Sequence, residues 1–132
     1  MSATAPSRRE ALLVGPLEIL PDEHLARADG RTLMLSVREL RMLTELARRA
    51  DRIMARDELF SLVWGRDMRR GDRSVDVYVR KLRVKLEDAL PSWCFIHTHF
   101  GFGYRLAPEP SHVFHTTADG RPQTAIRMKE TR

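Results

Sequence analysis

The sequence predicts an α+β fold in which a small N-terminal antiparallel sheet is followed by three helices and a C-terminal β-hairpin. Three features predict it: an Asp-Gly pair between two short apolar runs, a helix-capping pattern ahead of an amphipathic stretch, and a Gly-Phe-Gly sequence flanked by aromatic and β-branched residues. With 132 residues, of which 42% are hydrophobic, the chain has the size of one domain with a modest core. We expect this domain at residues 11–107, between flexible termini at residues 1–10 and 108–132.

The N-terminal sheet is predicted from four short runs of strand-forming residues, at 12–14, 17–20, 24–28 and 31–35. The last two runs flank Asp29-Gly30. An Asp-Gly pair favours a tight hairpin, because both central residues of its turn take a positive φ. We therefore expect the strands to pair in an antiparallel sheet.

Two helices are expected next. Ser36 and Glu39 have the spacing of a capping box, in which the side chain of each residue accepts a hydrogen bond from the backbone N–H of the other. The apolar residues that follow keep to one helical face: Val37, Leu40, Leu43, Ala47 and Ala50. A second, shorter helix is predicted over residues 56–64 and ends at Gly65.

The third helix, predicted over residues 72–89, has two distinct faces. Its core stripe consists of Val75, Val79, Leu82 and Leu86, which lie within about 60° of one another. Its opposite face holds Arg73, Val77, Arg80 and Val84, flanked by Asp76 and Lys81. A helix that enters the major groove of DNA needs basic residues for guanine edges and phosphates, and small apolar groups for thymine methyls. We therefore interpret Val77 as a groove contact, although single exposed valines are common.

The positive charge of the chain is concentrated in and just before this helix. The chain has 23 Lys and Arg against 18 Asp and Glu, a net charge of +5 and a pI of about 10.1. Residues 66–85 hold eight of the basic and three of the acidic residues, so this segment alone carries +5 and the remainder is neutral. Such an excess is typical of a nucleic-acid surface or of a solvated Arg-rich helix. The sorting of the residues by face favours nucleic acid.

The C-terminal hairpin is predicted from aromatic and β-branched residues on both sides of Gly101-Phe102-Gly103. The two glycines fit a hairpin tip and not a phosphate-binding loop, because no helix begins after them. A small sheet, three helices and a terminal hairpin together predict a winged helix-turn-helix, with the hairpin as its wing.

The sequence resembles the DNA-binding effector domain of the OmpR/PhoB response-regulator family over about residues 17–106. Four motifs in matching order carry the resemblance: Leu35-Ser36-Val37-Arg38-Glu39-Leu40, Arg56-Asp57-Glu58-Leu59 running to Val63-Trp64-Gly65, Arg73-Ser74-Val75-Asp76-Val77-Tyr78-Val79-Arg80-Lys81-Leu82-Arg83, and Gly101-Phe102-Gly103-Tyr104-Arg105. Each motif is weak by itself, and together they are specific.

The resemblance implies a transcription regulator that binds double-stranded promoter DNA sequence-specifically, with the third helix in the major groove and the wing, residues 94–106, near the minor groove. The predicted base contacts are Asp76, Val77 and Lys81, with Arg80 added by its outward position, and the predicted phosphate contacts are Trp64, Arg73, Ser74, Tyr78, Arg83, Thr98 and Tyr104. The loop that matches the RNA polymerase contact of the family consists of Arg66, Asp67, Met68, Arg69 and Arg70. Family members often bind direct repeats as head-to-tail dimers.

The sequence departs from the family pattern in three places. About eleven residues precede the first strand, so we expect the chain to act without a phosphorylatable receiver domain. The wing has Phe100 where the family usually has Arg, with Phe102 at the tip, so these aromatic rings either wedge between base steps or pack on the wing or a partner. The second helix follows Ala55 instead of a Ser or Thr cap, which removes about 1 kcal/mol of capping that Asp57 is expected to offset through the helix dipole.

No enzymatic, metal or cofactor site is expected. Cys94, His97 and His99, with His112 and His115 in the tail, match no zinc-ligand spacing, and no nucleophile lies beside an orienting base. A single cysteine fits a reducing compartment, and no apolar run approaches the roughly 20 residues of a membrane span. We therefore predict a cytoplasmic, nucleoid-associated protein that is not an enzyme.

Two alternatives remain at the level of sequence. A winged-helix adaptor would act mainly through protein contacts with RNA polymerase or another regulator, using residues 66–71, the two wing phenylalanines and the tail. A sequence-blind DNA coater would bind only phosphates, but it would gain nothing from Asp76 and Val77 on the outward face.

Overall fold

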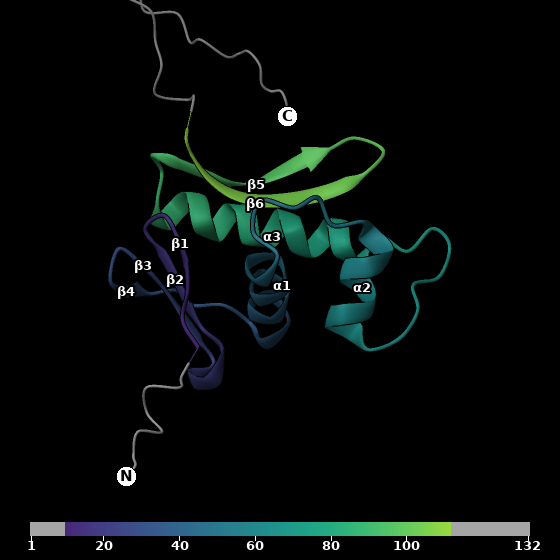
Figure 1. The fold of residues 1–132 in the computed structure, drawn as a ribbon, viewed down its shortest axis with the longest axis horizontal. Helices are drawn as coiled ribbons and strands as arrows, with labels where there is room; N and C mark the ends of the chain where they lie inside the picture. The colour runs from purple at the N-terminus through teal and green to yellow at the C-terminus, as the bar shows by residue number, and fades with distance from the viewer. Residues whose placement is uncertain (1–9, 112–132) are drawn as a thin grey trace, which may run out of the picture.

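The structure, a computed structural model, describes residues 10–111 (Figure 1). Its elements are β1 (Leu12–Val14), β2 (Leu17–Leu20), the 3-10 turn η2 (Pro21–Glu23), β3 (Leu25–Ala28), β4 (Arg31–Thr32), α1 (Val37–Arg48), α2 (Arg56–Trp64), α3 (Ser74–Ala89), β5 (Trp93–His99) and β6 (Gly103–Pro110). This order confirms the predicted α+β winged helix-turn-helix. None of the described helices is long and apolar enough to cross a membrane.

The N-terminal sheet has the antiparallel order β1-β2-β3-β4. Asp29 and Gly30 connect β3 to β4 with φ values of 52° and 81°, as the Asp-Gly turn requires. Strands β3 and β4 are shorter than predicted. His24 takes a left-handed conformation after η2, so β3 begins at Leu25, and β4 ends at Thr32 before the chain turns into α1.

Helix α1 begins with the predicted capping box: Ser36 Oγ accepts from the backbone N–H of Glu39, and Glu39 Oε1 accepts from that of Ser36. The prediction that Val37 belongs to the core face is wrong, since it is 87% exposed. Val37 is the first helical residue, and side chains in a helix tilt toward its N-terminus, so it points past the core. Ala50 is exposed as well, because α1 ends at Arg48.

The core is built from all the layers. Figure 1 shows α1 between the N-terminal sheet on one side and α2 on the other, with α3 and the hairpin packed across them. Its largest fully buried side chains are Leu17, Ile19, Met42, Leu43, Leu46, Met54, Leu59, Phe60, Val75, Val79, Leu82 and Leu106. Three of the four residues in the predicted α3 stripe are less than 2% exposed, and the fourth, Leu86, is 3% exposed.

The hairpin of β5 and β6 is longer than predicted. Trp93 pairs with Pro110 and Cys94 with Glu109, so β6 continues to Pro110 and residues 108–110 belong to the domain instead of the tail. Residues 108–110 have the composition of a linker, but their backbone pairs with β5 and holds them in the hairpin. The rest of the predicted tail, and the predicted N-terminal extension at residues 1–9, lie outside the described residues.

A buried carboxylate links α1 to α3. Glu39 is 4% exposed, and its Oε1 lies 2.6 Å from Lys85 Nζ and 2.8 Å from the backbone nitrogen of Ser36. Burial by itself would raise the pKa of Glu39, but the hydrogen bonds from Lys85 and Ser36 outweigh it and lower the pKa below its ordinary 4.5. The ionised carboxylate therefore stabilises the fold.

We expect Lys85→Met to lower the free energy of unfolding by about 2 kcal/mol at neutral pH, because it leaves a buried carboxylate without its charged donor. Since the folded-state pKa of Glu39 is depressed, this contribution is present above pH 4.5 and is lost as the pH falls through the folded-state pKa. Urea unfolding followed by Trp fluorescence measures both effects. Lys81→Met on the same helix has no such partner, so an equal destabilisation in that control would contradict the assignment.

Candidate nucleic-acid interface

The solvent face of α3 carries cations that are not neutralised. Arg80 and Lys81 are exposed, and the ion pairs of α3 within residues 10–111 involve Asp76 and Lys85 instead of these two side chains. Val77 lies between them and the start of the helix and is 39% exposed. Among the described residues, the helix therefore presents two positive charges without a carboxylate partner, and a small apolar group, on one surface.

The start of α3 is held by a network around Asp76. Its Oδ1 accepts hydrogen bonds from Arg56 Nε of α2, at 2.7 Å, and from the Tyr104 hydroxyl of β6. Its Oδ2 lies 3.8 Å from Arg73 Nη1, whose side chain is 80% exposed. A base contact by Asp76 therefore stays a prediction, and the structure shows its carboxylate engaged within the protein.

The electrostatics of this network favour the ionised carboxylate. Burial opposes ionisation, but the hydrogen bonds from Arg56 and Tyr104 lower the pKa of Asp76 below its ordinary value. Burial and the bond to Asp76 raise the pKa of the Tyr104 hydroxyl, which keeps it a donor. The Tyr104 ring lies 5.8 Å from the Arg56 guanidinium and 5.7 Å from that of Arg83, within the range of cation–π attraction.

A second link joins α3 to the wing. Arg83 donates to the carbonyl oxygen of Ile96 at 2.8 Å and to Thr98 Oγ1 at 2.7 Å. Burial lowers the pKa of its guanidinium, which is partly enclosed between helix and hairpin. The sequence predicts Arg83 and Thr98 as phosphate contacts, and the structure places them together beneath the wing.

Aromatic residues connect α2 to α3. Trp64 stacks on Phe60 with ring centroids 4.7 Å apart, and its other neighbour, Tyr78, lies edge-on at 5.5 Å. Arg38 of α1 covers the Trp64 ring at 4.8 Å, and Lys81 covers Tyr78 at 4.8 Å. Trp64 and Tyr78 are half-buried, and their phosphate contacts stay predictions.

The first turn of α3 is capped from the loop before it. Asp72 Oδ1 accepts from the backbone N–H of Ser74 at 2.7 Å, and the Ser74 hydroxyl together with this bond lowers the pKa of Asp72. In the loop, the arginines at 66, 69 and 70 are all exposed, and the Arg66 guanidinium lies over the Phe60 ring at 4.8 Å. Met68 packs against the core and Asp67 is exposed, so one side of the loop is anchored.

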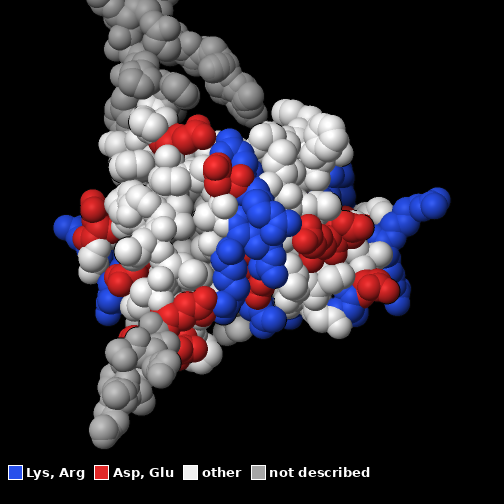
Figure 2. All heavy atoms as spheres, viewed as in Figure 1, with Lys and Arg blue, Asp and Glu red and all other residues white. Residues whose placement is uncertain are grey.

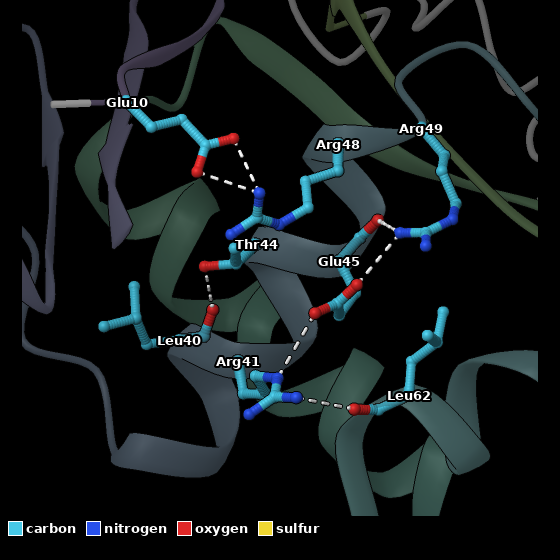
Figure 3. A network of polar contacts seen from close by, with 8 residues as sticks. All are labelled: Glu10, Leu40, Arg41, Thr44, Glu45, Arg48, Arg49 and Leu62. Atoms are coloured by element: carbon cyan, nitrogen blue, oxygen red, sulfur yellow. Dashed lines mark hydrogen bonds and ion pairs between the residues drawn. The ribbon is translucent and has the colours of Figure 1, made fainter. Parts of the chain in front are cut away.

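A second basic surface does not follow from the sequence patterns. Figure 2 shows a stripe of Lys and Arg side chains across the middle of the molecule, where Figure 1 draws α1. Helix α1 carries Arg41, Arg48 and Arg49. These arginines are paired: Arg41 and Arg49 bind Glu45 at 3.2 and 2.9 Å, and Arg48 binds Glu10 at 2.6 Å (Figure 3). The α1 stripe is therefore largely neutralised, unlike Arg80 and Lys81 on α3.

The wing histidines have roles within the protein. His97 Nε2 lies 3.0 Å from the carbonyl oxygen of Ala107, and His99 Nε2 accepts from Arg105 Nε at 3.0 Å. Burial lowers the pKa of His97. Within the described chain, no three His, Cys, Asp or Glu side chains gather where they could hold a metal ion. His112 and His115 lie outside the described residues.

Two arginines of the interface have no role predicted from sequence: Arg56, which binds Asp76, and Arg38, which covers Trp64. One signal could have identified Arg56. It is a cation in the first turn of a helix, where the helix dipole disfavours positive charge, so a compensating carboxylate is expected nearby.

Comparison with known proteins identifies the family. The family described as "Transcriptional regulatory protein, C terminal" matches residues 30–106. The chain belongs to this family. Its fold is that of the OmpR/PhoB-type DNA-binding domains, as the sequence resemblance implied.

Individual relatives show the extent of the similarity. Transcriptional regulatory protein AfsQ1 of Streptomyces coelicolor is 44% identical over 80 residues, which are 61% of this chain and 36% of that protein. PhoP of Bacillus subtilis, an alkaline phosphatase synthesis transcriptional regulatory protein, is 37% identical over 95 residues, or 72% of this chain and 40% of that protein. The chain thus spans about two-fifths or less of the length of these curated relatives.

Solved structures match the whole domain. The Klebsiella pneumoniae RstA DNA-binding domain in complex with RstA box is 36% identical with a TM-score of 0.68, covering 76% of this chain and 99% of that one. The DNA-binding domain of CpxR from E. coli is 30% identical with a TM-score of 0.68, covering 74% and 96%.

We expect Asp76→Asn to destabilise this OmpR/PhoB-type domain by about 1–3 kcal/mol, because the charge-assisted bonds to Arg56 and Tyr104 weaken. The folded-state pKa of Asp76 is lowered, so the deficit is full above its ordinary 3.8 and shrinks as the pH falls through the folded-state pKa. Thermal unfolding across pH measures this. Asp88→Asn is the control on the same helix, since Asp88 is exposed and its stability change should stay below about 0.5 kcal/mol.

Proposed function

We propose that this chain binds double-stranded promoter DNA sequence-specifically and regulates transcription, with α3 in the major groove and the wing of β5 and β6 beside it. The observation that carries the proposal is the outward face of α3, where Arg80 and Lys81 lie free of carboxylates next to Val77. Arginine and lysine bind guanine edges and phosphates, and a valine methyl fits a thymine methyl. The RstA domain, a relative of the same fold, has been solved in complex with its box.

The proposed role of each side chain depends on whether it is exposed or already bound to another residue of the protein. Arg80, Lys81 and Val77 read base edges in this proposal, while Arg73, Tyr78 and Trp64 contact phosphates. In this proposal the wing is positioned against α3 by Asp76, Arg83, Thr98 and Tyr104. Ser74 is the first residue of α3, where its backbone N–H binds Asp72. A cytoplasmic, nucleoid-associated location is part of the same proposal, because the partner is chromosomal DNA.

We expect Arg80→Ala combined with Lys81→Ala to lower affinity for the selected site by about 100-fold or more, since the variant removes two base-edge interactions of roughly 1–3 kcal/mol each. The site comes from selection out of a random DNA pool, which also reveals any direct repeat spaced by about 10–10.5 bp, as a head-to-tail dimer requires. Binding isotherms at several salt concentrations measure the affinity. The slope of log K against log salt should fall by roughly 0.9 for each phosphate that the variant no longer neutralises.

The matched control is Arg41→Ala combined with Arg48→Ala. It likewise removes two positive charges, but from α1, where Arg41 is paired with Glu45 and Arg48 with Glu10. Only a small decrease in affinity is expected there. Equal decreases from the two pairs would mean that net charge and not groove contact drives binding, and the proposal would be wrong.

The loop of Arg66, Asp67, Met68, Arg69 and Arg70 is proposed to contact RNA polymerase. Its support is its position at the junction of α2 and α3, with Met68 anchored in the core and Arg69 and Arg70 projecting to solvent.

We expect Arg69→Ala combined with Arg70→Ala to reduce polymerase recruitment to a bound promoter at least several-fold, while binding to the site alone changes little. In vitro transcription with purified polymerase, together with DNA binding by each variant, separates the two effects. Parallel decreases in recruitment and in DNA affinity would show that the two arginines bind DNA instead.

A further inference from the structure

The tip of the wing exposes two large aromatic side chains. Phe100 and Phe102 are 75% and 72% exposed, and they flank Gly101, which takes a φ of +84° in the three-residue loop between β5 and β6. From His99 to Gly103 the tip contains no Lys, Arg, Asp or Glu. Within the described residues these phenylalanines do not pack in the core, and an exposed apolar patch of this kind marks an interaction surface.

The base of the wing is rigid. Met54 and Tyr104 exchange two backbone hydrogen bonds, of 2.7 and 2.9 Å, between the segment before α2 and the strand β6. A side chain at Gly103 would overlap the carbonyl oxygen of Met54, so only glycine permits this approach. Arg105 adds an ion pair to Asp51 at 2.8 Å. The aromatic tip thus extends from a fixed support.

The tip is also fixed relative to α3. Tyr104, two residues after Phe102, binds Asp76 in the first turn of α3, and Arg83 binds Thr98 two residues before Phe100. Figure 1 shows the hairpin running along α3, with its tip extending past the N-terminal end of that helix. DNA that receives α3 in its major groove therefore meets the tip at its adjacent backbone and minor groove.

We propose that Phe100 and Phe102 act as apolar wedges that enter the minor groove beside the α3 site, unstack a base step and bend the DNA. This inference rests on the proposed function. Phenylalanine is among the side chains that minor-groove proteins insert between base steps, and the energy of unstacking is offset by the surface that the bent duplex buries. Because the base of the wing is fixed, binding needs to order only the short tip and its two phenylalanine side chains.

A wedge differs from a phosphate contact in what it makes measurable. The energy needed to unstack a base step depends on its sequence, so a wedge favours flexible pyrimidine–purine steps at the position it contacts. It adds no counterion release, so it leaves the salt dependence of binding unchanged.

The test uses the full chain and a series of duplexes with the selected site. Each duplex carries 2-aminopurine at a different base step beside the α3 site and a pair of fluorophores at its ends. With the wild-type chain, we expect one step to gain 2-aminopurine fluorescence and energy transfer to report a bend. Phe100→Ala combined with Phe102→Ala should abolish both signals and lower affinity about tenfold, with the salt slope unchanged. Phe100→Leu combined with Phe102→Leu should retain part of both signals.

The matched control is Met34→Ala combined with Val37→Ala, which removes apolar side chains that are 81% and 87% exposed near the start of α1. It should bind and bend the DNA as the wild type does. The wedge is overturned if the wild-type complex shows neither unstacking nor bending. It is also overturned if the Phe100→Ala and Phe102→Ala variant bends the DNA as the wild type does, even if that variant recruits less polymerase.

The proposed function fails separately from the wedge. It fails if the Arg80 and Lys81 variant retains specific binding, whereas failure of the wedge leaves specific recognition by α3 in place.

Discussion

The carboxylate of Asp76 connects the three elements that form the proposed DNA surface. It accepts from Arg56 of α2 and Tyr104 of β6 while it lies in the first turn of α3. Because the charge is partly buried, the hydrogen bonds from Arg56 and Tyr104 are needed to offset the cost of burial, and each of these donors belongs to a different element. The angle between α3 and the wing therefore depends on this junction. To contact a base, Asp76 would have to give up its bonds to Arg56 and Tyr104.

Neutralisation, more than charge, distinguishes the two basic surfaces of the molecule. Arg41, Arg48 and Arg49 of α1 bind Glu45 and Glu10, so most of their positive charge is balanced within the fold. Arg80 and Lys81 have no such carboxylate partner in the described chain. Only unpaired cations can replace the counterions of DNA without first giving up an internal partner, which is why α3 and not α1 is the expected DNA-binding surface.

The wing combines two properties that usually compete. Its base is fixed by Met54, Asp51 and Arg83, whereas its tip leaves two phenylalanines in water. Exposing such groups is unfavourable in the free protein, and a rigid base lets that free energy be recovered in a complex without the entropy cost of ordering a loop. In the proposed complex, the two phenylalanines replace the basic wing contact of the family, while the base of the wing is held by contacts within the domain.

The sequence by itself determined the features that depend on neighbouring residues: the Asp29-Gly30 turn, the Ser36 and Glu39 capping box, and the faces of α3. These features follow from backbone preference and helical period, which act within a few residues. Element ends were less predictable, as the exposed Val37 and the extension of β6 to Pro110 show. Only the tertiary structure decided which polar residues are free and which are paired. Arg56 and Tyr104 lie 20 and 28 residues from Asp76, and such contacts exist only after packing has brought distant elements together.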